Sequence, residues 1–198
     1  MLCSILKSVT FGLFVTGNQI GADGVKALAN ALKGGSLEIL TLNGNMPAGR
    51  RLGMGRLGQY RQLAEMTQGM HALGEFLRTS VTLQYVSLTQ TQLGPESATI
   101  IAVTVPNKLL ELDVSDNAYI TRKAAEQLGQ AVRKHTSMEV FCGIPLPGLR
   151  NGTLTELNLE GKHIGDHGAF VISDLLANGS LVTLNLTGET QNRAFLRV

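Results

Sequence analysis

The chain has 198 residues, of which 43% are hydrophobic and 16% are charged, and its formal net charge is +2. This length and apolar content can bury a sizeable core, and so small a net charge argues against recognition of nucleic acid or of an anionic membrane. The two cysteines, Cys3 and Cys142, form no C-x-x-C pair, so neither a disulfide framework nor a zinc site is indicated.

The N-terminal stretch MLCSILKSVTFGLFVTG is apolar but is interrupted by Lys7, and no basic residue precedes the apolar run. A signal peptide carries its positive charge ahead of the apolar segment. We therefore interpret residues 2–6 as the end of a helix, with Leu13 and Val15 in the strand that follows. No stretch approaches the twenty or so apolar residues of a membrane span. These features predict a cytoplasmic protein.

Two stretches of 27 residues have the same layout, and they begin at Thr10 and at Leu154. Each opens with apolar residues at strand spacing, continues through a turn of the form I-G-x-x-G, and ends with apolar residues at helical spacing. The strand pattern then starts again, at Leu37 and at Leu181. A match this long at a fixed period indicates an internal repeat of one strand and one helix.

Altered copies of the unit occupy the middle of the chain. The strand pattern restarts at Leu83 and at Leu109, and residues 138–153 form a degenerate unit in which Pro145 and Pro147 replace a helix. An asparagine closes the strand pattern, and its amide is expected to turn inward and satisfy backbone groups of the turn. Asn18, Asn45 and Asn117 fit this role, whereas Thr91, Lys162 and Glu189 depart from it. Because a buried Lys or Glu is costly, those turns must face outward or loosen.

The unit L-x-x-L-x-L-x-x-N, with its spacing of 26–29 residues, resembles a leucine-rich repeat. Its I-G-x-x-G turn and long helical half resemble the ribonuclease-inhibitor subclass, which also occurs in the sensor arms of NACHT-type receptors and in Ran GTPase-activating proteins. The resemblance implies an α/β solenoid, a horseshoe with parallel strands on the concave face and helices on the convex face. We expect one domain of about six repeats over residues 1–198. Neither end carries the polar cap that a solenoid needs, so we expect a piece of a longer array.

An irregular Gly/Arg-rich insert is expected at residues 46–69, where one repeat is stretched to 46 residues. It contains the pattern G-x-G-x-x-G, but no βαβ unit surrounds it, so nucleotide binding is not favoured. Its arginines have no acidic residue between them and are candidate contacts for an anion or a partner; the alternative is a solvated loop. These arginines are Arg50, Arg51, Arg56 and Arg61.

The residues between the leucines of each strand are expected to point outward along the inner sheet. They are acidic in the C-terminal half of the chain and neutral, with Phe14 and Tyr85, in the N-terminal half. A strip of carboxylates on a rigid sheet attracts a basic protein patch, and aromatic side chains often contribute interface energy. The predicted partner-binding residues are Tyr85, Glu111, Asp113, Asp116, Glu156, Asn158 and Glu160.

Catalysis and metal binding are not indicated. His163 and His167 fall at turn positions, and Cys142 with His135 lacks an orienting third residue. We predict a non-enzymatic scaffold without a cofactor that binds a protein partner through the concave sheet and adjacent loops. The partner is expected to carry a basic patch, and nucleic acid, membrane and small-molecule substrates are not expected. The family resemblance leaves two alternatives open, a small-GTPase regulator and the sensor arm of a NACHT-type receptor.

Overall fold

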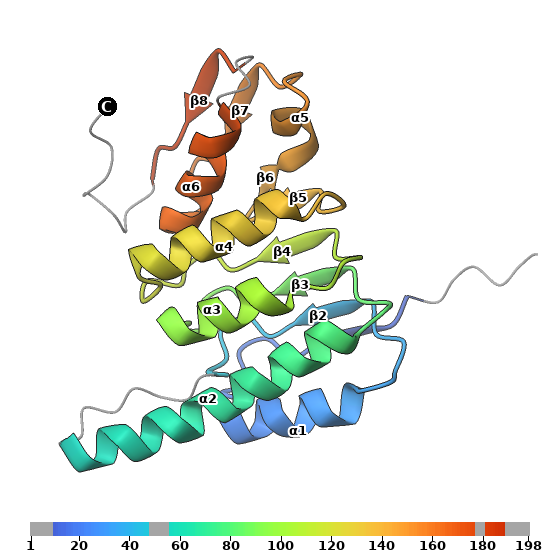
Figure 1. Ribbon diagram of the computed structural model, residues 1–198, viewed down its shortest axis with the longest axis vertical. Helices are drawn as coiled ribbons and strands as arrows, with labels where there is room; N and C mark the ends of the chain where they lie inside the picture. The colour runs from blue at the N-terminus through green and yellow to red at the C-terminus, as the bar shows by residue number, and fades with distance from the viewer. Residues whose placement is uncertain (1–9, 48–55, 177–180, 189–198) are drawn as a thin grey trace, which may run out of the picture.

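The computed structural model describes residues 10–47, 56–176 and 181–188, and for residues 56–66 it describes the backbone. Strands follow one another along one side of the molecule and helices along the other (Figure 1). The elements, in chain order, are β1 (Gly12–Phe14), α1 (Ala22–Leu32), β2 (Ile39–Thr41), α2 (Arg56–Thr79), β3 (Tyr85–Ser87), α3 (Pro95–Thr104), β4 (Glu111–Asp113), α4 (Arg122–Lys134), β5 (Val140–Phe141), β6 (Ile144–Pro145), α5 (Leu146–Arg150), β7 (Glu156–Asn158), α6 (Gly165–Leu176) and β8 (Thr183–Asn185).

Strands β1 to β5 pair in parallel and in sequence order. The register places the central strand residues opposite one another, Leu13 against Leu40, Leu40 against Val86, and Val86 against Leu112. A single unit of one strand and one helix cannot bury its apolar face, and stacking joins these faces into one core. The predicted stacking of strand–helix units is confirmed for this part of the chain.

The expectation of parallel strands alone is wrong in the degenerate unit. Strands β5 and β6 form an antiparallel hairpin, and its two connecting residues, Cys142 and Gly143, have φ of 49° and 77°. Two-residue hairpin turns of the favoured type need positive φ at both positions. Pro145 in β6 has no backbone N–H to donate to another neighbouring strand. For this reason proline in a sheet is confined to edge strands, strand starts and bulges. The six-stranded sheet ends at β6, and β7 and β8 form a separate parallel pair.

The segment 46–69, expected to be an irregular insert, contains the first part of the 24-residue helix α2. Gly58 and Gly69 lie within the helix without ending it, and Gly69 is needed for packing. A Cβ at Gly69 would lie 2.6 Å from the carbonyl oxygen of Ala22 and 2.7 Å from that of Pro47. Glycine at this position therefore lets α2 approach the start of α1 closely.

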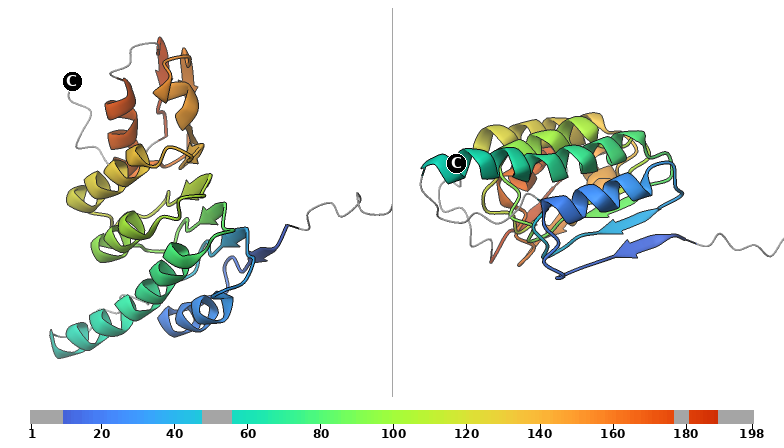
Figure 2. Two further views of the ribbon diagram at one scale, coloured as in Figure 1. Left: turned by 45° about the vertical axis from the view of Figure 1, so that its right-hand side comes forward. Right: turned by 90° about the horizontal axis from the view of Figure 1, so that it is seen from below.

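Helix α5 has only five residues, so α4 packs directly against α6 (Figure 2). A Cβ at Gly129 would lie 3.3 Å from Cβ of Phe170, and Arg133 Nε lies 3.1 Å from Asp174 Oδ2. Arg150, at the end of α5, donates hydrogen bonds to carbonyl oxygens at the end of α4 and in the segment after it. The acceptors within 3.0 Å are the carbonyl oxygens of Val132, His135 and Met138.

The turn asparagines Asn45 and Asn117 behave as predicted, because both are buried and their amides bind backbone groups of two units. Asn45 Oδ1 accepts from the N–H groups of Asn18 and Ile20, while its Nδ2 donates to Val15 and Leu42. Of the exceptions, Thr91 is buried, Lys162 is exposed and turned outward, and Glu189 lies outside the described residues.

Six units have a turn position that holds asparagine or its replacement: Asn18, Asn45, Thr91, Asn117, Lys162 and Glu189. The residue directly before each of these positions has a left-handed backbone conformation. The sequence analysis did not identify this feature, although four of the six residues are glycine, which adopts positive φ without a Cβ penalty. Gln90 and Asp116 take the same conformation with φ of 55° and 57°. The glycines are Gly17, Gly44, Gly161 and Gly188.

Candidate partner-binding surface

The outward-facing side chains of β1–β4, β7 and β8 form what we call the strand surface. In each of these strands except β8 the central residue is more buried than its neighbours, and it is almost fully buried in β2, β3, β4 and β7. This alternation follows from the two-residue period of a strand with one face on a core. It places the predicted residues Tyr85, Glu111, Asp113, Glu156 and Asn158 on the strand surface.

Tyr85 and Glu111 lie directly opposite each other in neighbouring strands. Tyr85 is 38% exposed, and the partly buried Glu111 carboxylate has no hydrogen bond or ion pair with any residue that the structure describes. Burial raises the pKa of Glu111 above its ordinary value, and the nearby carboxylate of Asp113 raises it further. Among the described residues, this carboxylate therefore has no cation paired with it to offset the burial.

Asp113 and Asn158, at corresponding places in β4 and β7, are partly engaged in their own turns. Asp113 Oδ1 accepts hydrogen bonds from the N–H and the hydroxyl of Ser115, at 3.0 and 2.7 Å. Asn158 Oδ1 accepts from the N–H of Glu160 at 3.1 Å. Short polar side chains favour such local turns. Both residues shape the loops beside the strand surface, so substituting them would change the loops as well as the surface.

Asp116 lies in the loop after β4, and it contacts residues of two other units. Its Oδ2 accepts from Gln90 Nε2 at 3.2 Å, and its Oδ1 is 3.6 Å from His163 Nδ1. The backbone N–H of Asp116 also donates to the carbonyl of His163 at 3.3 Å. His163 belongs to the unit after the degenerate one, so its contact with Asp116 was not foreseen from sequence spacing.

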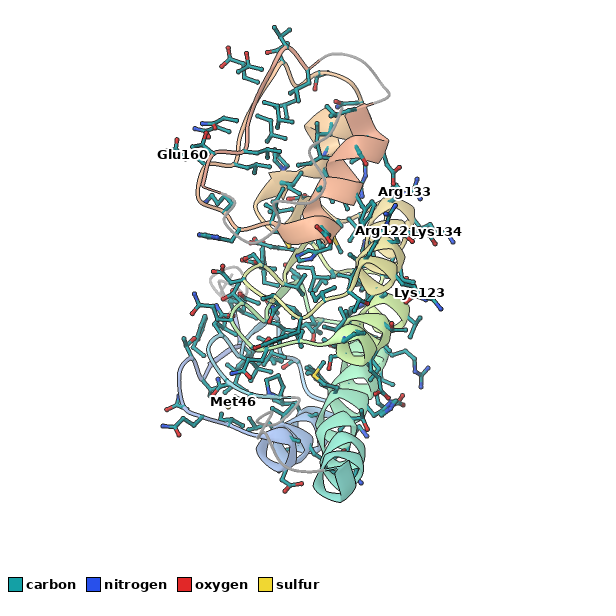
Figure 3. The ribbon with its side chains drawn as sticks, turned by 90° about the vertical axis from the view of Figure 1, so that its left-hand side faces the viewer. Met46, Arg122, Lys123, Arg133, Lys134 and Glu160 are labelled. Carbon is teal, nitrogen blue, oxygen red and sulfur yellow. The ribbon has the colours of Figure 1, made fainter. Side chains whose placement is uncertain are left out.

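The predicted acidic strip is divided between the two sheets. Tyr85, Glu111 and Asp113 belong to the six-stranded sheet. Glu156 pairs with Thr183 in the two-stranded sheet, and Glu160 Oε2 accepts from Asn185 Nδ2 at 3.3 Å. Figure 3 shows Glu160 on the opposite side of the molecule from the basic residues of α4. These are Arg122, Lys123, Arg133 and Lys134.

Aromatic side chains lie at the N-terminal end of the strand surface. Phe14 is 67% exposed and Phe11 is 53% exposed. The ring of Phe14 lies over the backbone of Gly12, where a Cβ would be 2.4 Å from Phe14 Cε2. Phe14, Thr41, Ser87 and Asp113 form one register row, so the row runs from an apolar end to an acidic end.

The arginines of the insert are not brought to the strand surface by anything that the structure describes. Arg50 and Arg51 lie outside the described residues. Arg56 and Arg61 belong to α2, and the structure describes only their backbone. Their suggested contact with an anion or a partner therefore stays a prediction.

The histidines and Cys142 occupy separate places. Cys142 is fully buried, and burial raises the pKa of its thiol well above the ordinary value, which disfavours the reactive thiolate. His135 Nε2 lies 2.6 Å from the carbonyl oxygen of Pro106. His167 is buried with its ring edge-on to Phe141, and burial lowers its pKa to about 4. In the described part of the chain, no group of three or more His, Cys, Asp or Glu is placed to hold a metal ion.

Comparison with known proteins bears on the repeat. A family model described as Leucine Rich repeat matches residues 13–29 and 150–173, which overlap the two stretches with the same layout. The match supports a leucine-rich repeat protein. No curated protein matches the chain. No helix among residues 10–47, 56–176 and 181–188 has the length and apolar character needed to cross a membrane.

Proposed function

We propose that this chain is a non-catalytic binding module that recognises a basic patch on a protein partner through the strand surface. The observation that carries the proposal is the exposed Tyr85 beside Glu111, a half-buried carboxylate that forms no ion pair with the described residues. Leucine-rich repeat proteins generally mediate protein–protein interaction, and the family match supports that class. The proposed module keeps the strands on a concave, ribonuclease-inhibitor-like inner face and acts in the cytoplasm.

Electrostatics supports a cationic contact at Glu111. Desolvation and the neighbouring Asp113 both raise the free energy of the ionised Glu111 side chain. A Lys or Arg side chain placed between the two carboxylates would offset both effects, and Arg presents a fork of donors suited to carboxylates. Tyr85 adds apolar area and a hydroxyl next to the same position, and tyrosine is common among residues that dominate binding energy.

The test needs substitutions that change charge without disturbing the turns. Glu111 and Glu156 meet this need, because neither carboxylate has a hydrogen bond or ion pair with the described residues. Asp113, Asn158 and Glu160 are less suitable because they bind their own or a neighbouring turn. The test variant is therefore Glu111→Lys with Glu156→Lys.

A matched control carries the same change of net charge on the helix side. Asp23 and Glu96 are exposed in the first turns of α1 and α3, so the control is Asp23→Lys with Glu96→Lys. Proteins captured by the wild-type chain would be purified and their Kd measured with each variant, after equal melting temperatures are shown. We expect at least a tenfold weaker Kd for the test variant and a small change for the control. Equal weakening in both would exclude the strand surface as the site.

A further inference from the structure

Helix α4 carries a line of polar side chains on the face that points away from the core, and we call this line the α4 stripe. The helix buries its opposite face, between Ala124 and Val132. At 3.6 residues per turn, positions separated by four, three and four residues line up along the helix. The exposed residues at these intervals are Lys123, Gln127, Gln130 and Lys134. The stripe thus has a lysine at each end, about 16 Å apart at a rise of about 1.5 Å per residue.

The two lysines of the α4 stripe form no hydrogen bond or ion pair with any residue that the structure describes. The nearby carboxylates are already engaged: Glu126 pairs with Arg122 at 3.0 Å, and Asp174 pairs with Arg133 at 3.1 Å. The helices on either side of α4, α3 and α6, contain neither Lys nor Arg. The α4 stripe is therefore a basic surface whose charges are not used within the described part of the chain.

The strand surface carries two carboxylates in the same condition. Glu111 in β4 and Glu156 in β7 form no hydrogen bond or ion pair with the described residues. In Figure 1, β5 and β6 lie between these two strands. Neighbouring strands are about 4.8 Å apart, so the strands of the two carboxylates are separated by more than about 10 Å. Lysines about 16 Å apart on a helix can therefore each approach a different carboxylate.

The α4 stripe and the strand surface lie on opposite sides of the molecule. Figure 3 shows Lys123 and Lys134 on one side, and Glu160, in the loop after β7, on the other. The apolar core lies between the two sides, so these charges cannot pair within one chain. A contact between two copies through unlike surfaces leaves one surface of each kind free on the pair, and further copies can add to both.

We propose that the α4 stripe of one copy of this chain docks on the strand surface of a second copy. The two ammonium groups of the stripe lie against Glu111 and Glu156, and the stem of a lysine packs along the exposed ring of Tyr85. Each surface supplies the charge that the other lacks, and a lysine at Glu111 offsets the cost of its partly buried carboxylate. The inference rests on the proposed function, because it names the basic partner of the same surface.

The test measures self-association of the full chain by sedimentation velocity over a range of concentrations. At low ionic strength the mean mass of the wild type should rise with concentration, and it should return to that of the monomer in high salt, because salt screens exposed charges. Two variants reverse one surface each: Glu111→Lys with Glu156→Lys, and Lys123→Glu with Lys134→Glu. Either variant alone should weaken the Kd of self-association by about tenfold or more, because it places like charges opposite each other.

Matched controls make the same changes of net charge elsewhere. Asp23→Lys with Glu96→Lys matches the first variant, and Lys33→Glu with Lys108→Glu matches the second; all four residues are exposed and lie outside both surfaces. Equal melting temperatures would first show that every variant folds. The controls should associate as the wild type does. Equal weakening in a variant and its control would overturn the inference, since net charge alone would then explain the loss.

An equimolar mixture of the two surface variants gives the sharpest result. In the mixture the introduced lysines of one chain face the introduced glutamates of the other, and the unchanged surfaces are also complementary, so association should return. A wild type that stays monomeric at low ionic strength, or a mixture that stays monomeric, would overturn the inference. The proposed function would still stand if the Kd of a captured protein were weakened by Glu111→Lys with Glu156→Lys, and it would fail separately if that Kd were unchanged.

Discussion

Asn117 Oδ1 accepts a hydrogen bond from the backbone N–H of Thr91 at 3.0 Å, and Thr91 occupies the place where the repeat pattern calls for another asparagine. The hydroxyl of Thr91 donates to the carbonyl of Leu88 at 2.6 Å, so this fully buried side chain satisfies its own turn. The threonine hydroxyl thus makes the hydrogen bond that the asparagine side-chain N–H makes to its own turn in other units, such as Asn117 Nδ2 to Val114. Its hydroxyl also reaches Asn117 Oδ1 of the next unit at 3.3 Å, but it makes no hydrogen bond to a described residue of the unit before its own.

Asn117→Ala should therefore lower the free energy of unfolding strongly. The change leaves the buried N–H groups of Thr91 and Leu93 without an acceptor, and each unsatisfied buried group costs about 1–3 kcal/mol. We expect a loss of about 2–4 kcal/mol in urea unfolding. Asn18→Ala removes only exposed bonds to its own turn and should cost under about 1 kcal/mol. Equal losses at both sites would contradict the joining role of Asn117.

Gln90→Gly should stabilise the chain, because Gln90 has a left-handed φ of 55°. Relief of that conformation is worth about 1–2 kcal/mol, and the greater freedom of glycine in the unfolded chain offsets about half of it. The reverse change, Gly17→Ala, tests the same effect, since φ is 70° and a Cβ there would meet no atom within 4 Å. We expect opposite changes of about 1 kcal/mol in the free energy of unfolding, measured by urea unfolding. A stabilised Gly17→Ala would contradict this account.

Stability should fall in mild acid because of His167. Burial lowers its folded-state pKa to about 4, below the ordinary value of about 6.5, so protonation favours the unfolded chain. The contribution is fully present above pH 6.5 and is lost as the pH falls from 6.5 to 4, by about 3 kcal/mol in total. His167→Leu should remove the fall in the free energy of unfolding between pH 6.5 and 4. The same substitution at His71, which is exposed, should leave that fall unchanged. An unchanged slope in His167→Leu would reject the assignment.

Arg150→Met should destabilise the end of α4. The guanidinium donates to the carbonyl oxygens of Val132, His135 and Met138, and hydrogen bonds from a charged group contribute about 1.5–3 kcal/mol. Methionine keeps much of the apolar stem, so we expect a loss of about 2 kcal/mol. Arg133→Met removes an exposed ion pair and should change stability by under about 1 kcal/mol. Thermal unfolding of both variants would show whether the two losses differ.

Glu111→Gln should separate stability from binding. Burial and then Asp113 raise the pKa of Glu111, so its ionised form opposes folding above that pKa. The neutral amide should leave the free protein at least as stable at pH 7, while the Kd for a basic partner becomes weaker. Binding by the wild type should also weaken as Glu111 becomes protonated. Because the pKa of Glu111 is raised, this weakening should begin at a higher pH than it would for an ordinary carboxylate. A destabilised variant with unchanged Kd would show that Glu111 is structural.

The sequence was informative where one unit repeats another. Leu40, Val86 and Leu112 were placed in register by the frame alone, because an apolar strand residue that recurs in each unit has few ways to be buried other than by stacking. Asn45 and Asn117 followed from the same frame. The glycines before the turns carried a further signal, since only glycine adopts positive φ freely, and reading it would have revealed the strained Gln90 and Asp116.

What the sequence by itself determined is the unit: a strand, a turn and a helix, with the residues that face the core and those that face outward. Only the tertiary structure decided how the units meet where they differ. The Cys142–Gly143 turn ends the six-stranded sheet, the five-residue α5 lets α4 meet α6, and Asp116 reaches His163 across the degenerate unit. The physical reason is that periodicity reports what each residue does within its own unit, whereas contacts between unlike units depend on packing that no local pattern encodes.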